Sequence, residues 1–311
     1  MNQGEPLWVA VCQRSKRKTA RVCSLKSKKA MEAGELCPRH AKMERMIEHL
    51  RPGASAKDAR VALFDFDGTL STIRSGWVEE MVPMMVEILA DLKSGESEAE
   101  LTELVKEFVG RLTGKQTMYQ MIELADNITA RGGKPEDPLV YKKMYLDRLW
   151  ERIKGRIDDL EKGHTPPEKW LVPGSFQLLE GLKERGMKLY LASGTDDAFV
   201  KNEARILQVD KYFDGGVYGA LDDYKAFSKA ILIQRIISSA EFGGQQFLGF
   251  GDGYVEIENV KNVGGVAVGV ASDEPECAKV DPWKRDRLVG VGADWIVPHF
   301  ADRDELFAAI F

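Results

Sequence analysis

Long apolar stretches are missing from this 311-residue sequence, although 44% of its residues are hydrophobic. No run approaches the roughly 20 apolar residues that a membrane-spanning helix needs. The order of a secretory signal peptide is missing too, because the short apolar run Leu7–Val11 is followed by basic residues. We therefore expect a protein that stays in the cytoplasm and does not bind a membrane.

Cysteine is also scarce. The four cysteines do not form an evenly spaced disulfide framework, and three of them lie within the first 40 residues. Cys12, Cys23, Cys37 and His40 are of the residue types that bind Zn²⁺. The Cys-x-x-Cys pair typical of zinc sites is missing among them. A segment without zinc is therefore favoured over a zinc site.

Charge is unevenly distributed along the chain. Residues 1–60 contain 14 Lys and Arg against 6 Asp and Glu, whereas the remainder contains 30 against 43. Together with the Pro- and Gly-containing linker Arg51–Ser55, this shift predicts a separate basic extension at residues 1–55. The extension could bind nucleic acid. Its basic segment lacks the interleaved aromatic residues that stack on bases, which favours a solvated or partner-docking arm.

Most of the remaining sequence alternates between strand-like and helix-like segments. The apolar run Val61–Phe64 is typical of a strand buried on both faces of a parallel sheet. After Pro173 the pattern predicts helices at 175–185, 196–207, 226–240 and 254–263, and strands at 188–192, 216–219, 246–250, 266–270 and 295–297. The sequence therefore predicts an α/β fold built on a doubly wound parallel sheet.

Residues 76–163 interrupt this alternation. Met81, Met84, Met85, Ile88 and Leu89 recur at helical spacing, and no strand-like pattern intervenes before residue 163. We expect an all-helical domain at 76–163, inserted into a core made of residues 56–75 and 164–311. The methionines should pack inside that helical domain.

Polar residues follow three of the predicted strands. Asp65 and Asp67 end the first, Ser193 and Gly194 follow the strand at 188–192, and Asp252 follows the strand at 246–250. In an open α/β sheet, active-site groups gather beyond the carboxyl ends of the strands. Carboxylates, a hydroxyl and a nearby lysine are the inventory that phosphoryl transfer requires, together with a hard cation bound by oxygen ligands.

These motifs resemble those of the haloacid dehalogenase-like hydrolase superfamily over roughly residues 60–311. The first family motif, Asp-x-Asp-x-Thr, is matched by Asp65, Asp67 and Thr69, and the second by Ser193. The fourth, Gly-Asp-x-x-x-Asp, is matched by Gly251 and Asp252, with Glu256 in the last place where Asp is commoner. The third motif is a lone lysine; Lys229 is favoured because it opens a predicted helix, and Lys225 is the alternative.

The resemblance implies a role for each matched residue. Asp65 would attack phosphorus and form an aspartyl-phosphate, and Asp67 would act as the general acid and base. Asp65, the backbone carbonyl of Asp67 and Asp252 would bind Mg²⁺, with Glu256 near the metal directly or through water. Ser193, Gly194 and Lys229 would hold the phosphoryl oxygens.

The resemblance also suggests what the protein acts on. Family members with a helical insertion after the first motif, similar to phosphoglycolate phosphatase and β-phosphoglucomutase, use it as a mobile cap that selects the substrate. Arg74, Trp77 and Glu80 follow the motif closely and could face the cleft. We expect a phosphatase of a small phosphorylated metabolite, such as a sugar phosphate or a phosphoglycolate-like compound. The alternatives are a phosphomutase, or a phosphatase that the basic N-terminus directs to nucleic-acid ends.

Overall fold

The computed structural model describes residues 47–221, 227–239 and 242–311. Residues 46–311 form one compact unit. The described residues do not include the candidate zinc ligands or Lys225, nor the runs Leu7–Cys12 and Ala20–Leu25, whose sequence patterns predict two short strands in the N-terminal extension. Within the described part of the chain, no helix is both long enough and apolar enough to cross a bilayer.

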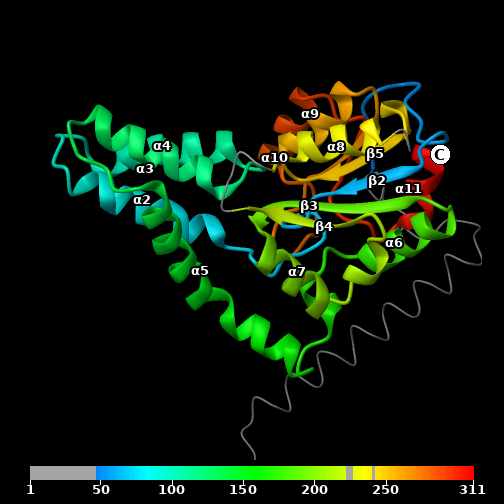
Figure 1. The fold of residues 1–311 in the computed structure, drawn as a ribbon, viewed down its shortest axis with the longest axis horizontal. Helices are drawn as coiled ribbons and strands as arrows, with labels where there is room; N and C mark the ends of the chain where they lie inside the picture. The colour runs from blue at the N-terminus through cyan, green and yellow to red at the C-terminus, as the bar shows by residue number, and fades with distance from the viewer. Residues whose placement is uncertain (1–46, 222–226, 240–241) are drawn as a thin grey trace, which may run out of the picture. The chain divides into compact units, whose positions relative to one another are not determined.

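A seven-stranded sheet forms the centre of the core (Figure 1). Its strand order is β1-β7-β6-β5-β2-β3-β4, and every neighbouring pair is parallel except β1 with β7. The strands are β1 (Glu48–His49), β2 (Val61–Phe64), β3 (Lys188–Asp196), β4 (Gly216–Ala220), β5 (Phe247–Gly251), β6 (Val266–Val270) and β7 (Trp295–Val297). The predicted α/β fold with a parallel sheet is therefore confirmed.

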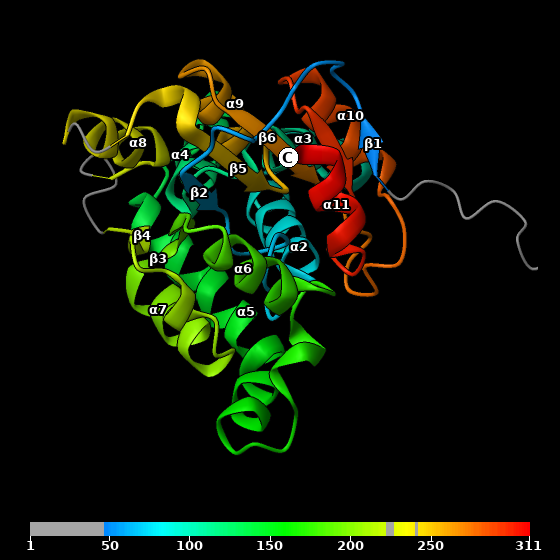
Figure 2. The same ribbon diagram turned by 90° about the vertical axis from the view of Figure 1, so that its right-hand side faces the viewer.

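The residues of β2 alternate between two hydrophobic cores, one on each face of the sheet. Ala62 and Phe64 pack on the face covered by α6 (Ser175–Glu184) and α7 (Asp197–Ile206). Val61 and Leu63 pack on the face covered by α8 (Lys229–Ser238), α9 (Tyr254–Asn262) and α10 (Pro282–Gly290). Figure 2 shows these helices on both sides of the strands. Burial on both faces explains why β2 is a continuous apolar run rather than an alternating one.

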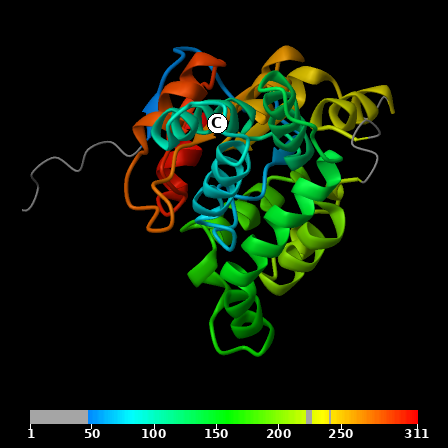
Figure 3. The same cartoon turned by 90° about the vertical axis from the view of Figure 1, so that its left-hand side faces the viewer.

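Residues 77–161 form four helices and no strand, as the methionine and leucine spacing predicts. They are α2 (Trp77–Ala90), α3 (Glu98–Leu112), α4 (Thr117–Ala130) and α5 (Pro138–Glu161) (Figure 3). Ser97 and Glu100 form a reciprocal capping box at the start of α3, and Asp137 caps α5. Met81, Met84 and Met85 are completely buried, so the methionines pack the interior of this helical block.

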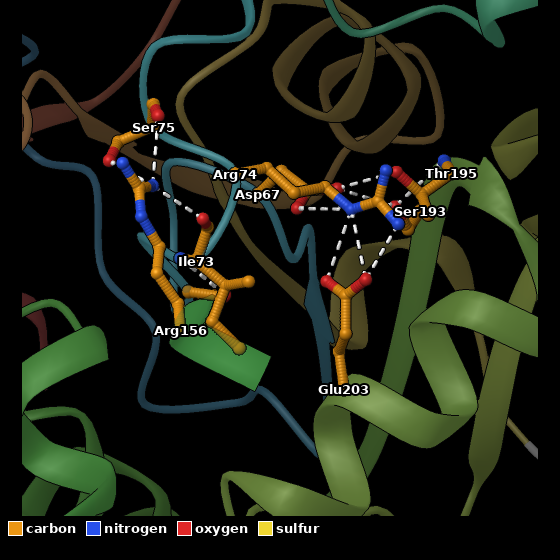
Figure 4. A network of polar contacts seen from close by, with 9 residues as sticks. Asp67, Ile73, Arg74, Ser75, Arg156, Ser193, Thr195 and Glu203 are labelled. Atoms are coloured by element: carbon orange, nitrogen blue, oxygen red, sulfur yellow. Dashed lines mark hydrogen bonds and ion pairs between the residues drawn. The ribbon is translucent and has the colours of Figure 1, made fainter. Parts of the chain in front are cut away.

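The chain enters and leaves the helical block at neighbouring points. The backbone N–H of Thr72 donates to the carbonyl of Trp170, and that of Val172 donates to the carbonyl of Leu70, both at 2.9 Å. Arg156 of α5 donates to the carbonyl of Ile73 at 2.6 Å (Figure 4). Its guanidinium also stacks over the Trp170 ring, 4.6 Å from the centroid. The two connections are therefore joined to each other and to the last cap helix.

Three features differ from the sequence prediction. The sequence pattern from about Pro38 to Leu50 favours a helix, but Glu48 and His49 instead form β1 and pair with Ile296 and Trp295 of β7. The stacking of His49 on Trp295, with centroids 5.3 Å apart, holds this short edge strand. β3 is longer than expected and contains Ser193 and Gly194. The helices α10 and α11 (Arg303–Ile310), of 9 and 8 residues, were not expected.

Candidate active site

The carboxyl ends of three adjacent strands meet at one cavity. β2 lies between β3 and β5, so the residues that follow Phe64 are neighbours of the ends of both strands. The cavity has a volume of about 90 Å³, and its lining from the core includes Asp65, Asp67, Ser193, Gly194 and Asp252. The structure thus brings together most of the residues selected from the sequence.

Asp65 and Lys229 form a buried ion pair. The Lys229 ammonium donates to Asp65 Oδ1 at 2.8 Å, and the two side chains are 4% and 7% exposed. Lys229 lies in the first turn of α8, where the Ser228 hydroxyl accepts from the backbone N–H of Ile231 and fixes the start of the helix. Lys229 also contacts the fully buried carboxylate of Glu256. Lys229 is therefore positioned to neutralise the charge of Asp65, and Glu256 contacts the same lysine.

Asp67 is held by two hydroxyl groups from β3. Thr195 Oγ1 donates to Asp67 Oδ2 at 2.8 Å and Ser193 Oγ at 3.3 Å (Figure 4). The Arg74 guanidinium lies 3.8 Å from Asp67 Oδ1. That oxygen is buried and accepts no hydrogen bond from any residue that the structure describes. One oxygen of Asp67 is thus fixed, and the other is available for a proton or a ligand.

Arg74 is itself fixed by a carboxylate of α7. Its Nε lies 3.1 Å from each Glu203 oxygen and its Nη2 lies 2.6 Å from Glu203 Oε1. Figure 4 shows the two side chains facing each other beside Asp67. Both are almost completely buried, at 9% and 4% exposure. Glu203 therefore holds Arg74 beside Asp67, and the two carboxylates share the positive charge of the Arg74 guanidinium.

Burial dominates the electrostatics of the two catalytic candidates. Burial raises the pKa of the Asp65 carboxyl to about 7, although the Lys229 ammonium acts in the opposite direction. Burial also raises the pKa of Asp67 to about 6, against the lowering effect of Arg74. Asp252 raises both pKa values further by charge repulsion. The site concentrates negative charge away from water, which is a setting that a bound cation stabilises.

Asp252 is oriented from both sides. Its backbone N–H donates to Thr69 Oγ1 at 2.9 Å, and its carboxylate Oδ2 lies 3.0 Å from the ammonium of Lys284 in α10. Lys284 also donates to Glu274 Oε1 at 2.5 Å. Burial acts to lower the pKa of Lys284, but the charges of Asp252 and Glu274 outweigh it and raise this pKa overall.

The carboxylates at this cavity fit a Mg²⁺ ion, which usually keeps several water ligands when it binds to a protein. Among the residues described, no cluster of three His, Cys, Asp or Glu side chains is arranged as a complete metal cage. Mg²⁺ does not require one, because it binds through one or two carboxylates, water and substrate phosphate. Asp65 and Asp252 supply two carboxylates at one cavity, and repulsion between them raises the pKa of Asp65. The Glu256 carboxylate contacts Lys229 and is not part of the lining of this cavity.

Two glycines of the motifs are required by close packing. Gly68 has φ +75°, and a Cβ there would lie 2.2 Å from Asp252 Oδ2. A Cβ on Gly194 would lie 2.7 Å from the backbone carbonyl of Lys115, which belongs to the loop between α3 and α4. The first contact lets the loop after β2 approach Asp252. The second lets the helical block approach the end of β3.

The helical block covers the cavity. Lys115, Gln120 and Tyr145 line it from this side, together with Trp77 and Met81. Polar contacts near the cavity join the block to the core, among them those from Gln116 Nε2 to the carbonyl of Phe227 at 2.6 Å and from Lys142 to Asp196 at 2.5 Å. Of the three residues expected to face the cleft, Arg74 and Trp77 line it, whereas Glu80 binds Arg152 at 2.7 Å.

Several residues of this site carry no motif signal. Thr195 lies two residues beyond the matched Ser193, and the alternation of β3 places both on the Asp67 side, which could have identified it. Glu203, Glu274 and Lys284 lie in helices or loops outside the motif segments of the sequence. Only the tertiary structure brings them close to Asp67 and Asp252.

Comparison with known proteins agrees with the geometry. The family model described as haloacid dehalogenase-like hydrolase matches residues 59–264. The chain belongs to this family of hydrolases. Its predicted identity as a hydrolase is thereby confirmed. No curated protein sequence matches the chain significantly.

Solved structures show the same fold as this haloacid dehalogenase-like hydrolase at low sequence identity. A predicted phosphoglycolate phosphatase from Haemophilus somnus has 16% identity and a TM-score of 0.50, covering 80% of this chain and 98% of its own. A predicted phosphatase from Clostridium acetobutylicum has 18% identity and a TM-score of 0.51, covering 80% and 97%. A haloacid dehalogenase-like protein of unknown function from Agrobacterium tumefaciens has 15% identity and a TM-score of 0.52, covering 81% and 98%.

Proposed function

We propose that this haloacid dehalogenase-like hydrolase is a Mg²⁺-dependent phosphatase that cleaves a small phosphate monoester through an aspartyl-phosphate on Asp65. The observation that carries the proposal is the pair of carboxylates at one cavity, the buried Asp65 bound by Lys229 and the half-buried Asp67 bound by Thr195. The two carboxyls have different partners, which suits them to different roles.

In the first step, a carboxylate oxygen of Asp65 attacks phosphorus and the bond from phosphorus to the ester oxygen breaks. Asp67 gives its proton to the departing oxygen, and its raised pKa of about 6 keeps a protonated fraction near neutral pH. In the second step, Asp67 takes a proton from water, whose oxygen attacks phosphorus. The bond to Asp65 then breaks, and inorganic phosphate and free Asp65 remain.

The neighbouring groups would hold the phosphoryl oxygens and the metal. Lys229 carries a positive charge 2.8 Å from Asp65, and Ser193, Gly194 and Lys229 together line a pocket that adjoins the cavity. Asp65, Asp252 and the backbone carbonyl of Asp67 would bind Mg²⁺. When bound, the ion neutralises the charge on the phosphoryl oxygens and offsets repulsion between Asp65 and Asp252.

Residues 76–163 would act as the cap that selects the substrate. The helical block and the core line one cavity, and a small organic phosphate would bind there. Trp77, Met81 and Tyr145 offer apolar surface, and Lys115 and Gln120 offer polar groups. This mixture would suit a sugar phosphate or a phosphoglycolate-like compound, and it supports the helical block as the part that selects the substrate.

A phosphate-release assay on a panel of phosphorylated metabolites tests the proposal. The full chain should release inorganic phosphate with Mg²⁺, and EDTA should abolish release until Mg²⁺ is restored. A phosphomutase would instead convert one phosphate ester into another with little release. Failure to release phosphate from any member of the panel or from an aryl phosphate, under conditions where the protein is folded, would contradict the proposal.

A further inference from the structure

Two lysines occupy equivalent electrostatic positions in the site. Lys229 lies between Asp65 and Glu256. Lys284 lies between Asp252 and Glu274, at 3.0 and 2.5 Å. Each carboxylate assigned above to Mg²⁺ therefore has its own lysine counter-ion, and each lysine has a glutamate as its second partner. The family motifs account for Lys229 but do not include Lys284.

Lys284 is held in place by its helix. The Asp281 carboxylate accepts from the backbone N–H of Lys284 at 2.9 Å and caps the first turn of α10. The neighbouring Trp283 packs against α3, where a Cβ on Gly110 would lie 2.9 Å from its ring. Arg287 stacks on the same ring, 4.5 Å from its centroid. These contacts fix the backbone from which the ammonium reaches Asp252.

The environment makes the Lys284 contact strong. The side chains of Lys284, Asp252 and Glu274 are only 15%, 11% and 18% exposed. The carboxylates of Asp252 and Glu274 also lie close to Gly68, where a Cβ would be 2.2 Å from Asp252 Oδ2 and 2.9 Å from Glu274 Oε1. Without Lys284, these two negative charges would face each other in a partly buried space. Interactions between charges so poorly exposed to water are weakly screened.

We propose that the Lys284 ammonium competes with the divalent cation for the Asp252 carboxylate. Glu274 weakens this competition by binding the same ammonium. The proposal rests on the metal site proposed above. A cation on Asp252 and the ammonium on the same carboxylate repel each other, so Lys284 weakens metal binding while it stabilises the metal-free protein. Glu274 draws the ammonium toward itself and leaves more of the Asp252 charge for the metal.

Calorimetric titration of the full chain with MgCl₂, after treatment with EDTA and dialysis, tests this arrangement. Lys284→Met, which keeps the length of the side chain and removes its charge, should bind Mg²⁺ about tenfold more tightly, as expected for removing one nearby positive charge. Its thermal midpoint should fall without Mg²⁺ and rise more than that of the parent when Mg²⁺ is added. Unchanged or weaker Mg²⁺ binding by Lys284→Met would overturn the proposal.

Two further variants complete the test. Glu274→Gln should weaken Mg²⁺ binding, because Lys284 is then left to Asp252 alone; this result does not depend on whether Lys284→Met folds, and equal or tighter binding overturns the proposal. Lys261→Met is the matched control, since Lys261 pairs with the buried Asp294 at 2.8 Å and does not line the catalytic cavity. It should leave Mg²⁺ affinity unchanged, and tightening equal to that of Lys284→Met would assign the effect to net charge and overturn the specific role of Lys284.

Asp252→Asn separates failure of the inference from failure of the proposed function. If the parent chain does not bind Mg²⁺, or binds it equally well after Asp252→Asn, both the proposed metal site and the competition by Lys284 are wrong. If the parent binds Mg²⁺ through Asp252 but Lys284→Met does not bind it more tightly, only the competition by Lys284 is wrong.

Discussion

Replacing Glu203 by glutamine should leave the Arg74 guanidinium buried without its main counter-ion. The parent pair has three nitrogen–oxygen contacts of 2.6 to 3.1 Å, and the side chains are 9% and 4% exposed. Removing one partner of a buried pair costs about 3–5 kcal/mol, because the other charge is left uncompensated. Asp67 stays 3.8 Å from Arg74 as a weaker partner. We therefore expect a loss near the lower limit, about 3 kcal/mol.

Urea unfolding of the metal-free protein measures this loss. The matched control is Glu87→Gln, whose pair with Arg148 is exposed, at 59% and 37% of the two side chains. An exposed pair contributes about 1 kcal/mol or less, so the control should change little. Equal small losses in the two variants would refute the assignment of Arg74 and Glu203 as a buried framework of the site.

The same substitution should alter catalysis in a way that depends on the leaving group. Arg74 released from Glu203 can pair fully with Asp67 and lower the pKa of its carboxyl, so less of the general acid is protonated. Turnover should fall about tenfold for an alkyl phosphate, which needs a proton on its leaving oxygen. An aryl phosphate leaves readily without that proton and should be affected less. Equal effects on both substrates would contradict the role of Arg74 and Glu203 in setting the acidity of Asp67.

Two other substitutions test the electrostatics and the cap. The folded-state pKa of Asp67, about 6, lies above its ordinary value of 3.8, so the folded protein binds more protons in that window and loses stability as pH rises through it. In EDTA, urea unfolding should therefore show Asp67→Asn about 3 kcal/mol more stable than the parent at pH 8 and nearly equal to it at pH 4; a pH-independent difference would refute this. Gly194→Ala should lower kcat/KM about tenfold or more by pushing the Lys115 loop from the end of β3. Gly155→Ala, where a Cβ meets nothing within 4 Å, is its control and should leave kcat/KM unchanged while it stabilises α5 by up to about 1 kcal/mol; equal kinetics of the two variants would refute the contact.

The sequence predicted the parts of the fold that have one strong local cause. The run Val61–Phe64 is β2 because both of its faces are buried, and the spacing of Met81, Met84 and Met85 follows the inner face of α2. Asp65, Asp67 and Asp252 lie together because parallel strands end at one edge of the sheet. Each of these predictions rests on periodicity or on chain direction, which a single sequence displays.

The features that the sequence did not predict depend on distant partners. Glu48 and His49 have no strand pattern, and only the free edge of β7 makes them β1. The apolar content of α10 is low, since Leu288 is its one buried residue, so its helical periodicity is weak. For the same reason Lys284 could not be placed at Asp252 in advance. Glu256 matched a motif by spacing, but its contact with Lys229 depends on how α8 and α9 pack.

Trapping the phosphorylated enzyme tests the central claim most directly. The full chain, mixed with Mg²⁺ and a ³²P-labelled phosphate monoester that it hydrolyses, should be quenched in acid within one turnover and digested. The account predicts an acid-stable label on the peptide that contains Asp65. It predicts neither label nor turnover in Asp65→Asn, whose folded state is checked by a cooperative thermal unfolding transition. Normal phosphate release by Asp65→Asn, or label on a peptide without Asp65, would contradict it.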